Sequence, residues 1–226
     1  MRNIDQRVAS EKFRFNNWGK VNFVMIEVFF DVETKKLFSE INTRNPGDLG
    51  VSVVSVYKRE LDSNQKEIQG EMCSFWEHEF TDMWKIFKEA DRIIGFNSLK
   101  FDVPALQPYA LFCLAKFSHF DIMEKVRKSL GRRLSLDNFA RSTLGETKID
   151  TGTNAVRYWR SGDKESLRKL RTYCEMDVQI TRKLYDFGMK NSYLKFTDKW
   201  NNPRTLAVDF SYPNNKTYSG KQISLF

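Results

Sequence analysis

The chain has 226 residues, enough for one α/β domain with a short appendage, and its 41% hydrophobic content suffices for a sizeable core. No apolar run approaches the ~20 residues of a membrane helix, and the first twenty residues lack the apolar region of a secretory signal, so we expect no membrane partner. The formal net charge of +8 favours a polyanionic partner such as nucleic acid, although solubility alone would also account for it.

Cysteine and histidine usage indicates a reducing compartment. The three cysteines are odd in number and widely spaced, which predicts reduced, mostly buried thiols in an intracellular, cytoplasmic protein: Cys73, Cys113 and Cys174. Because His78 and His119 are the only imidazoles, we do not expect a structural zinc site.

The first half of the chain indicates strands followed by a helix. Residues 1–21 are predicted to be an N-terminal extension, and translation from Met1 or Met25 remains open. The β-branched and aromatic stretch 21–34 predicts a central strand, and 49–58 predicts its hairpin-like neighbour. A turn-rich segment, 62–71, leads to a short strand at 73–76. A helix should then begin after Thr81 as N-cap.

The second half alternates strands and helices. Strands are predicted at 92–96 and 117–121, and helices from Asp102 or Val103, over 122–130, over 135–143 and over 165–190, the last ending near Gly188. Three meander strands followed by this alternation predict an α/β fold, with a mixed sheet flanked by helices, over residues 22–196. Residues 197–226 are predicted to be a partly ordered or disordered tail.

Two carboxylates end the first strand in the sequence FFDVET. Asp31 and Glu33 are two residues apart, so on a strand they face the same side. Their mutual repulsion is costly unless positive charge lies between them, and a divalent metal ion is one solution. Taken alone, the pair is better explained as the point where an ordinary strand leaves the core. Glu27 has the same parity but lies about 13 Å upstream, so we expect no catalytic role for it.

Two later segments carry further acidic residues. In IIGFNSLKFDVPAL, Asn97 and Asp102 follow a strand where a helix begins, and a helix cap would explain Asp102 but not Asn97. In LRTYCEMDVQ, Tyr173 and Asp177 are four residues apart and share one helical face beside an apolar stripe. That stripe predicts a partly buried carboxylate, although an ordinary surface Asp is the alternative.

In this order, D-x-E, N-x-x-x-F-D and Y-x-x-x-D resemble the three motifs of the DEDD exonuclease superfamily over roughly residues 22–196. The segment FDIMEKVRKSLGRRLSLDNFARSTLGETK is similar to the 3′–5′ exonuclease branch related to the proofreading domains of family A and B polymerases. The resemblance implies a ribonuclease H-like fold with a five-stranded mixed sheet. Thr172 stands where the histidine class has His, so Tyr173 indicates the tyrosine class.

The resemblance implies a two-metal 3′–5′ exonuclease using Mg²⁺ or Mn²⁺. Asp31 would bridge the ions, Glu33 and Asp177 would complete the nucleophile-activating site, and Asp102 would support the second ion. Tyr173 would orient the attacking water. The implied substrate contacts are Thr34, Asn97 and Phe101, with Lys100, Arg132, Arg133 and Lys148 as candidate phosphate contacts or, alternatively, solvated surface charges.

Three functions remain open at this point. The leading interpretation is an exonuclease acting on single-stranded DNA ends in replication or repair. The alternatives are a 3′–5′ exoribonuclease and a non-catalytic nucleic-acid-binding scaffold on a nuclease fold. The intact acidic set with Tyr173 argues against the scaffold.

The chain ends in QISLF, two of whose apolar residues are adjacent. This sequence resembles the pentapeptide by which bacterial replication and repair proteins bind the β sliding clamp, with Ile223 replacing Leu conservatively. The resemblance implies a clamp partner bound through Gln222, Ile223, Ser224, Leu225 and Phe226. It favours DNA as substrate and a bacterial or phage origin, whereas packing of the end onto the body is the alternative.

Overall fold

The structure, a computed structural model, describes the backbone of residues 13–15 and 21–23 and, with side chains, residues 24–147 and 152–211. Near the N-terminus, β1 (Phe13–Phe15) pairs antiparallel with β2 (Val21–Phe23). β2 and β3 (Met25–Thr34) occupy the stretch that the sequence analysis assigned to a single strand, 21–34.

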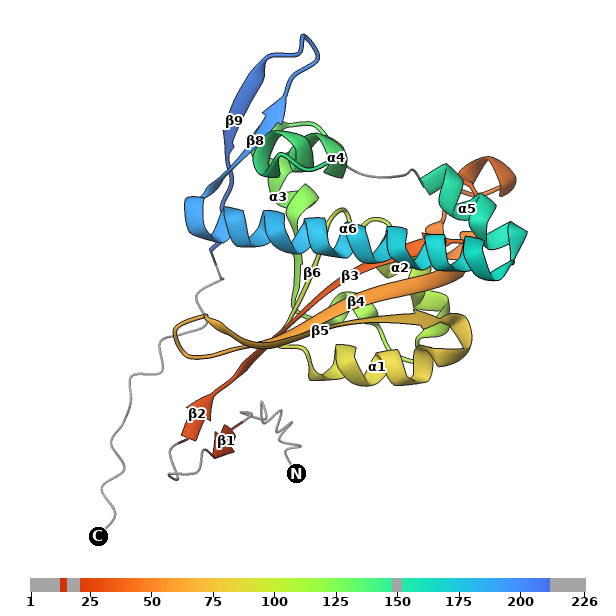
Figure 1. The fold of residues 1–226 in the computed structure, drawn as a ribbon, viewed down its shortest axis with the longest axis horizontal. Helices are drawn as coiled ribbons and strands as arrows, with labels where there is room; N and C mark the ends of the chain where they lie inside the picture. Colours follow the sequence, from red (N-terminus) through yellow and green to blue (C-terminus); the bar gives the residue numbers. More distant parts are fainter. Residues whose placement is uncertain (1–12, 16–20, 148–151, 212–226) are drawn as a thin grey trace, which may run out of the picture.

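A five-stranded mixed sheet forms the centre of the molecule, in the order β5-β4-β3-β6-β7 (Figure 1). β3 pairs antiparallel with β4 (Val51–Leu61), which pairs antiparallel with β5 (Glu67–Trp76). On its other side, β3 pairs in parallel with β6 (Arg92–Gly95), which pairs in parallel with β7 (His119–Asp121). The predicted five-stranded mixed sheet is confirmed.

Helices cover both faces of this sheet. Figure 1 shows the long α6 (Lys164–Asn191) across one face and α1 (Phe80–Glu89) on the other. The other α-helices of the described residues are α2 (Asp102–Leu106), α3 (Ile122–Leu130), α4 (Leu136–Phe139), which continues into a π-helical turn (Ala140–Leu144), and α5 (Gly152–Ser161).

Alternation along β3 builds two separate cores. Phe29 packs with Val178 and Leu184 of α6, whereas Val28 and Phe30 pack in the cluster that contains α1. All three β3 residues are buried, because helices cover both faces of the sheet. The near-continuous apolar run in β3 therefore serves two helical layers at once.

Several predicted boundaries are wrong. β5 begins at Glu67 and not near Cys73, because its turn-like residues pair with β4 as far as Leu61. α1 begins at Phe80, so Thr81 is not its N-cap. α5 was not predicted, and it precedes a longer helix than expected.

Gly188 does not end α6, which continues to Asn191. A Cβ atom at Gly188 would lie 2.2 Å from Cζ of Phe210, so the glycine allows the Phe210 ring to pack against the helix. Gly188 is therefore a packing residue and not a helix terminator. The helix is followed instead by Ser192 in a left-handed conformation, with φ of 59°.

A hairpin extends the ordered body past residue 197, where the sequence analysis placed the start of the tail. β8 (Tyr193–Thr197) pairs antiparallel with β9 (Pro203–Ala207). Val208 and Phe210 follow the hairpin and are buried in the core beneath α6. The start of the predicted tail thus contributes to the packed body.

The cysteines differ in exposure. Cys174 is buried and Cys73 is partly buried, but Cys113 is exposed, so the prediction of mostly buried thiols is wrong for Cys113. All three are free thiols. Across the part of the chain that the structure describes, no helix combines the length and the apolar character needed to cross a membrane.

Candidate active site

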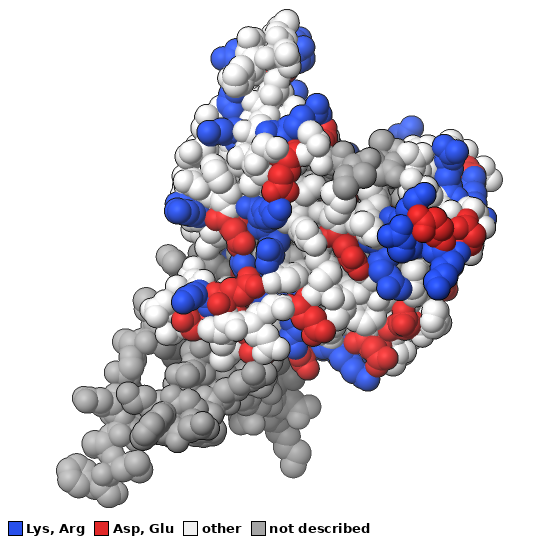
Figure 2. All heavy atoms as spheres, in the orientation of Figure 1, with Lys and Arg blue, Asp and Glu red and all other residues white. Residues whose placement is uncertain are grey.

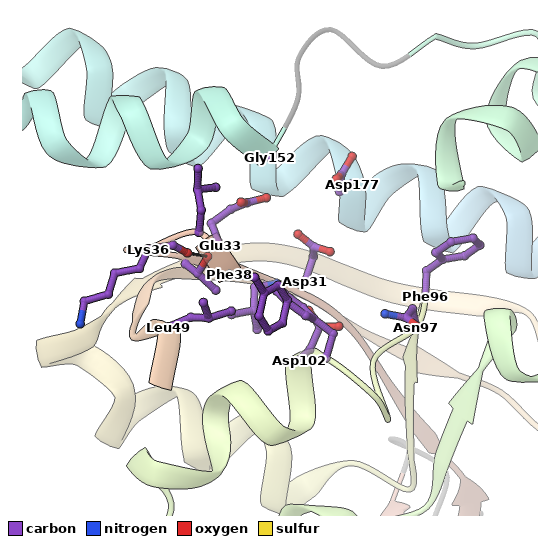
Figure 3. A pocket seen from close by; sticks show the side chains of 14 residues that line it. Asp31, Glu33, Lys36, Phe38, Leu49, Phe96, Asn97, Asp102, Gly152 and Asp177 are labelled. Carbon is purple, nitrogen blue, oxygen red and sulfur yellow. Dashed lines mark hydrogen bonds between the residues drawn. The ribbon is translucent and has the colours of Figure 1, made fainter. Parts of the chain in front are cut away.

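A cavity of about 260 Å³ opens where β3 ends (Figure 3). Its walls come from β3 and the segment after it, the connection from β6 to α2, the start of α5, and α6. Four carboxylates line it: Asp31, Glu33, Asp102 and Asp177. The topology therefore brings all four acidic residues of the three motifs to one place.

Three of these carboxylates form a tight cluster. Asp31, Glu33 and Asp177 each offer an oxygen, and these oxygens all lie within 4.8 Å of one another. Asp31 and Glu33 project from β3 toward α6, which carries Asp177, whereas the Lys36 side chain extends away from the cluster (Figure 3). Side chains alternate between the two sides of a strand, so Asp31 and Glu33 share one side, and a helix crossing that side needs to add only Asp177.

Cys174 connects α6 to β3 beside the cluster. Its Sγ donates to the backbone oxygen of Asp31 at 3.4 Å. Burial, followed by the negative charges of Asp31 and Glu33, raises the pKa of the Cys174 thiol well above its ordinary value, so the thiol keeps its proton. Cys174 was predicted only as one of the mostly buried thiols, and its contact with Asp31 was not foreseen, because only the fold brings Asp31 next to it.

Asp102 lines the cavity but lies outside the three-carboxylate cluster. Its Oδ1 accepts a hydrogen bond from the Val32 amide at 3.1 Å. That amide is accessible because the ladder between β3 and β6 ends at Phe29. Burial raises the pKa of Asp102 to about 8, and the negative charges of Asp121 and Asp177 act in the same direction. Backbone hydrogen bonds to the carboxylate oppose this increase.

Tyr173 is buried one helical turn before Asp177 and packs with Val53, Ala155 and Leu170. It is not among the residues that line the cavity. Its predicted role in orienting water therefore remains a prediction.

The loop between β6 and α2 is supported by Asp121, which the sequence analysis missed. The backbone amides of Asn97 and Leu99 donate to the two carboxylate oxygens of Asp121, at 2.8 and 3.0 Å. Asn97 adopts a left-handed conformation with φ of 67°, in which asparagine is tolerated better than most residues. The position of Asp121, between a strand and a helix, is the only local signal for this role.

The other predicted substrate residues differ in their surroundings. Thr34 and Phe101 line the cavity; the Thr34 hydroxyl donates to the Lys36 carbonyl oxygen at 2.9 Å, and the Phe101 ring packs edge-on against Phe38. Asn97 lines both this cavity and a smaller neighbouring one of about 30 Å³.

The predicted basic contacts are only partly gathered. Lys100 and Arg133 line the smaller cavity together with Arg127, which was not predicted. Arg132 instead lies over the Phe196 ring, 5.9 Å from its centroid. Lys148 and the clamp motif, Gln222 to Phe226, lie outside the described residues.

The donor set of the cluster fits a hard divalent cation. It consists of carboxylate oxygens alone, which Mg²⁺ and Mn²⁺ prefer. The mutual distances allow one ion to contact all three residues, and repulsion among three such groups favours binding of positive charge between them. Asp31, Glu33 and Asp177 would hold this ion, with Asp102 adjacent.

Comparison with known proteins agrees with this fold. A family scan matches residues 28–188 to the RNase H superfamily. Among solved structures, the family B DNA polymerase of the archaeon Pyrobaculum calidifontis matches with a TM-score of 0.50 and 19% identity, over 73% of this chain and 24% of that chain. The match thus spans about a quarter of the polymerase. The curated proteins contain no match. The family match covers most of the chain and all four motif carboxylates, and the chain therefore belongs to the RNase H superfamily.

Proposed function

We propose that this protein is a metal-dependent 3′–5′ exonuclease of the tyrosine class, acting on single-stranded DNA ends. The observation that carries the proposal is the cluster of Asp31, Glu33 and Asp177 within 4.8 Å, in an open cavity of an RNase H superfamily domain. Hydrolysis of a phosphodiester concentrates negative charge on phosphoryl oxygens. A site that collects cations suits that chemistry.

Two bound Mg²⁺ or Mn²⁺ ions would activate water and neutralise charge on the scissile phosphate. Asp31 would contribute to both ion sites, Glu33 and Asp177 to the one nearer the nucleophile, and Asp102 to the other. Glu33, Asp102 and Asp177 are buried, which fixes their positions before substrate binds, and Asp31 is partly buried.

The remaining cavity residues suit a terminal nucleotide. Phe101 and Phe96 offer aromatic surface, and Asn97 and Thr34 offer polar groups. Lys100 and Arg133 lie beside Asn97 in the smaller cavity, where they would meet a phosphate. Tyr173 would orient the attacking water. If so, Tyr173→Phe should slow cleavage without weakening metal binding.

DNA is preferred over RNA for two reasons. One solved structure that matches this chain is a DNA polymerase. The C-terminal QISLF sequence resembles a clamp-binding peptide, and tethering to a ring on DNA would raise the local concentration of the enzyme at its substrate.

The test is cleavage of 5′-labelled single-stranded DNA and RNA of the same sequence, with Mg²⁺ or Mn²⁺. We expect a descending ladder on DNA that Asp31→Asn and Asp177→Asn abolish. A ladder on RNA alone would make the protein an exoribonuclease. The absence of cleavage on either polymer would contradict the proposal, and a ladder that survives both substitutions would indicate a contaminating nuclease.

The clamp interaction has a separate test. The full-length chain and a version lacking residues 222–226 are passed over immobilised bacterial β clamp. We expect retention of the full-length chain alone, with Phe226→Ala behaving like the truncation because apolar anchors dominate such interfaces. Equal retention of both forms would contradict the clamp proposal and leave the nuclease proposal unaffected.

A further inference from the structure

Two tryptophans from distant parts of the chain stack near the acidic cavity. Trp76 ends β5 and Trp159 lies in α5, and their ring centroids are 6.3 Å apart with an interplanar angle of 27°. With Glu77, His78 and Leu167 they line a surface hollow of about 700 Å³. Both tryptophans are partly exposed, so part of their aromatic surface faces solvent here.

The hollow lies next to the acidic cavity. Thr34 and Lys36 line the cavity, and the residue between them, Lys35, holds its Nζ 5.2 Å from the centroid of the Trp159 ring. α5 begins at Gly152 on the cavity wall, and seven further residues to Trp159 cover about 10 Å of helix. A strand leaving the cavity with the stacked spacing of a duplex strand, about 3.4 Å per nucleotide, would cover that distance in about three nucleotides.

Positive charge surrounds the two rings. Residues 152–171 include six Lys or Arg and two Asp or Glu, a net charge of +4. The exposed Arg171 lies over the Trp76 ring, 5.5 Å from its centroid, and Arg157 is exposed on α5. Figure 2 shows Lys and Arg side chains, with fewer acidic ones, over α5 and the start of α6.

Acidic neighbours are engaged by nearby basic residues. Glu77 pairs with Lys35, and Glu40 pairs with Arg160. Glu165 pairs with Arg168 and lies 3.6 Å from Lys169. Their charges therefore oppose a polyanion less than free carboxylates would.

We propose that Trp76, Trp159, Arg157 and Arg171, the tryptophan platform, bind the part of a single-stranded nucleic acid that lies upstream of its reacting end. The rings would stack on bases, and the arginines would contact phosphates. Stacking on an aromatic face suits any base, so the platform would add affinity without sequence preference. This role rests on the proposed nuclease function, which supplies the strand end in the cavity.

The first experiment separates long from short strands. Binding of fluorescein-labelled dT12 is measured by anisotropy on the full chain carrying Asp31→Asn, and kcat/KM is measured on dT3 with Asp31 intact. We expect Trp159→Ala to weaken dT12 binding about tenfold and to change dT3 cleavage less than about twofold. Trp200→Ala is the matched control, because Trp200 is 70% exposed and lies between β8 and β9.

A second pair of variants covers the case in which Trp159→Ala unfolds. Arg171→Gln alters an exposed side chain and should weaken dT12 binding with a shallower dependence on salt concentration. Its control is Lys128→Gln, a side chain that is 68% exposed on α3. An unchanged dT12 affinity and salt slope in Arg171→Gln would overturn the arginine contacts.

The outcomes distinguish this proposal from the proposed function. If Trp159→Ala weakens dT12 binding but the unsubstituted chain cleaves no oligonucleotide, the platform stands and the nuclease proposal fails. If the unsubstituted chain cleaves and Trp159→Ala binds dT12 as tightly as the Trp200→Ala control, the platform is overturned and the nuclease proposal stands.

Discussion

The two ends of β3 handle negative charge in opposite ways. Glu27 and Asp31 are four residues apart on the same side of the strand, about 13 Å from each other. Glu27 is fully buried and accepts hydrogen bonds from Arg59, at 2.9 and 2.7 Å, and from the Tyr185 hydroxyl at 2.9 Å. Asp31 instead lies in a cluster with two further carboxylates.

Arg59 completes the charge balance at the first end. It also contacts Asp186 at 2.8 Å and Glu67 at 3.4 Å. Burial alone would lower the pKa of Arg59, but Glu27 and Asp186 raise it above its ordinary value, so the guanidinium stays charged. A buried acid with its own arginine serves the fold, whereas a group of like charges at a cavity favours a cation from solution.

The largest expected effect is on catalysis at the Asp31 end. Asp31→Asn should lower kcat by on the order of a thousandfold or more, since removing one electrostatic stabiliser of a transition state already costs about 10²–10³. Unfolding by urea without divalent ions should show no loss of stability, because one of three repelling charges is removed. Asp82→Asn, an exposed residue of α1, is the control and should retain full activity.

A substitution at the Glu27 end of β3 should lower the stability of the protein and leave catalysis intact. Arg59→Met leaves Glu27 buried without its guanidinium, which should lower the free energy of unfolding by about 3–5 kcal/mol. Lys58→Met is the matched control at the adjacent position, where an exposed pair with Glu89 contributes at most about 1 kcal/mol. Urea titrations measure both; equal stability of the two variants would contradict a structural role for Arg59.

Divalent ions should stabilise the protein through the acidic cluster. At 100 times the dissociation constant, Mn²⁺ should add about 2.7 kcal/mol to the free energy of unfolding. Thermal melts with and without Mn²⁺ should show a shift that Glu33→Gln reduces and Asp82→Asn preserves. An equal shift in Glu33→Gln would place the binding ion elsewhere.

The smallest expected effect concerns Asp198, a carboxylate that serves a turn. The Asn202 and Trp200 amides each donate to its Oδ1 at 2.9 Å, and Arg204 donates to Oδ2 at 3.0 Å. These bonds, that from the Asn202 backbone foremost, lower the pKa of Asp198 to about 2. The stabilisation is therefore fully present above about pH 4 and is lost as the pH falls through about 2.

Amide proton shifts of Trp200 and Asn202 between pH 6 and pH 2 measure this titration. Asp198→Asn should abolish the change at low pH. A midpoint near pH 4 in the unsubstituted chain would show that the turn does not favour the ionised carboxylate.

Much of the site could be predicted because the spacing of two residues along a strand or helix fixes whether their side chains share one side of it. The two-residue spacing of Asp31 and Glu33 places them on one side of a strand, and the structure shows them together. The position of Glu27 outside the cluster also followed from its distance to Asp31 along the strand. The role of Tyr173 in orienting water came from the family resemblance and not from spacing, and it stays a prediction.

Other features had little or no local signal. Asp121 supports the Asn97 loop only because β7 lies beside β6. Residues 67–71 have a turn-like composition, but pairing with β4 makes them a strand. In both cases a partner from a distant segment satisfies the backbone groups, and that partner overrides local propensity.

The sequence by itself determined the order of the five strands of the central sheet, the side of β3 that carries the acids, and the presence of a carboxylate on α6, but not α5 or the β8–β9 hairpin. Hydrophobic periodicity and residue spacing express these directly, because strand and helix geometry is constant. Only the tertiary structure decided which backbone amide meets Asp102, which thiol binds Asp31, and that Trp76 meets Trp159. Those contacts join segments 70 to 143 residues apart, and their formation depends on how the layers pack.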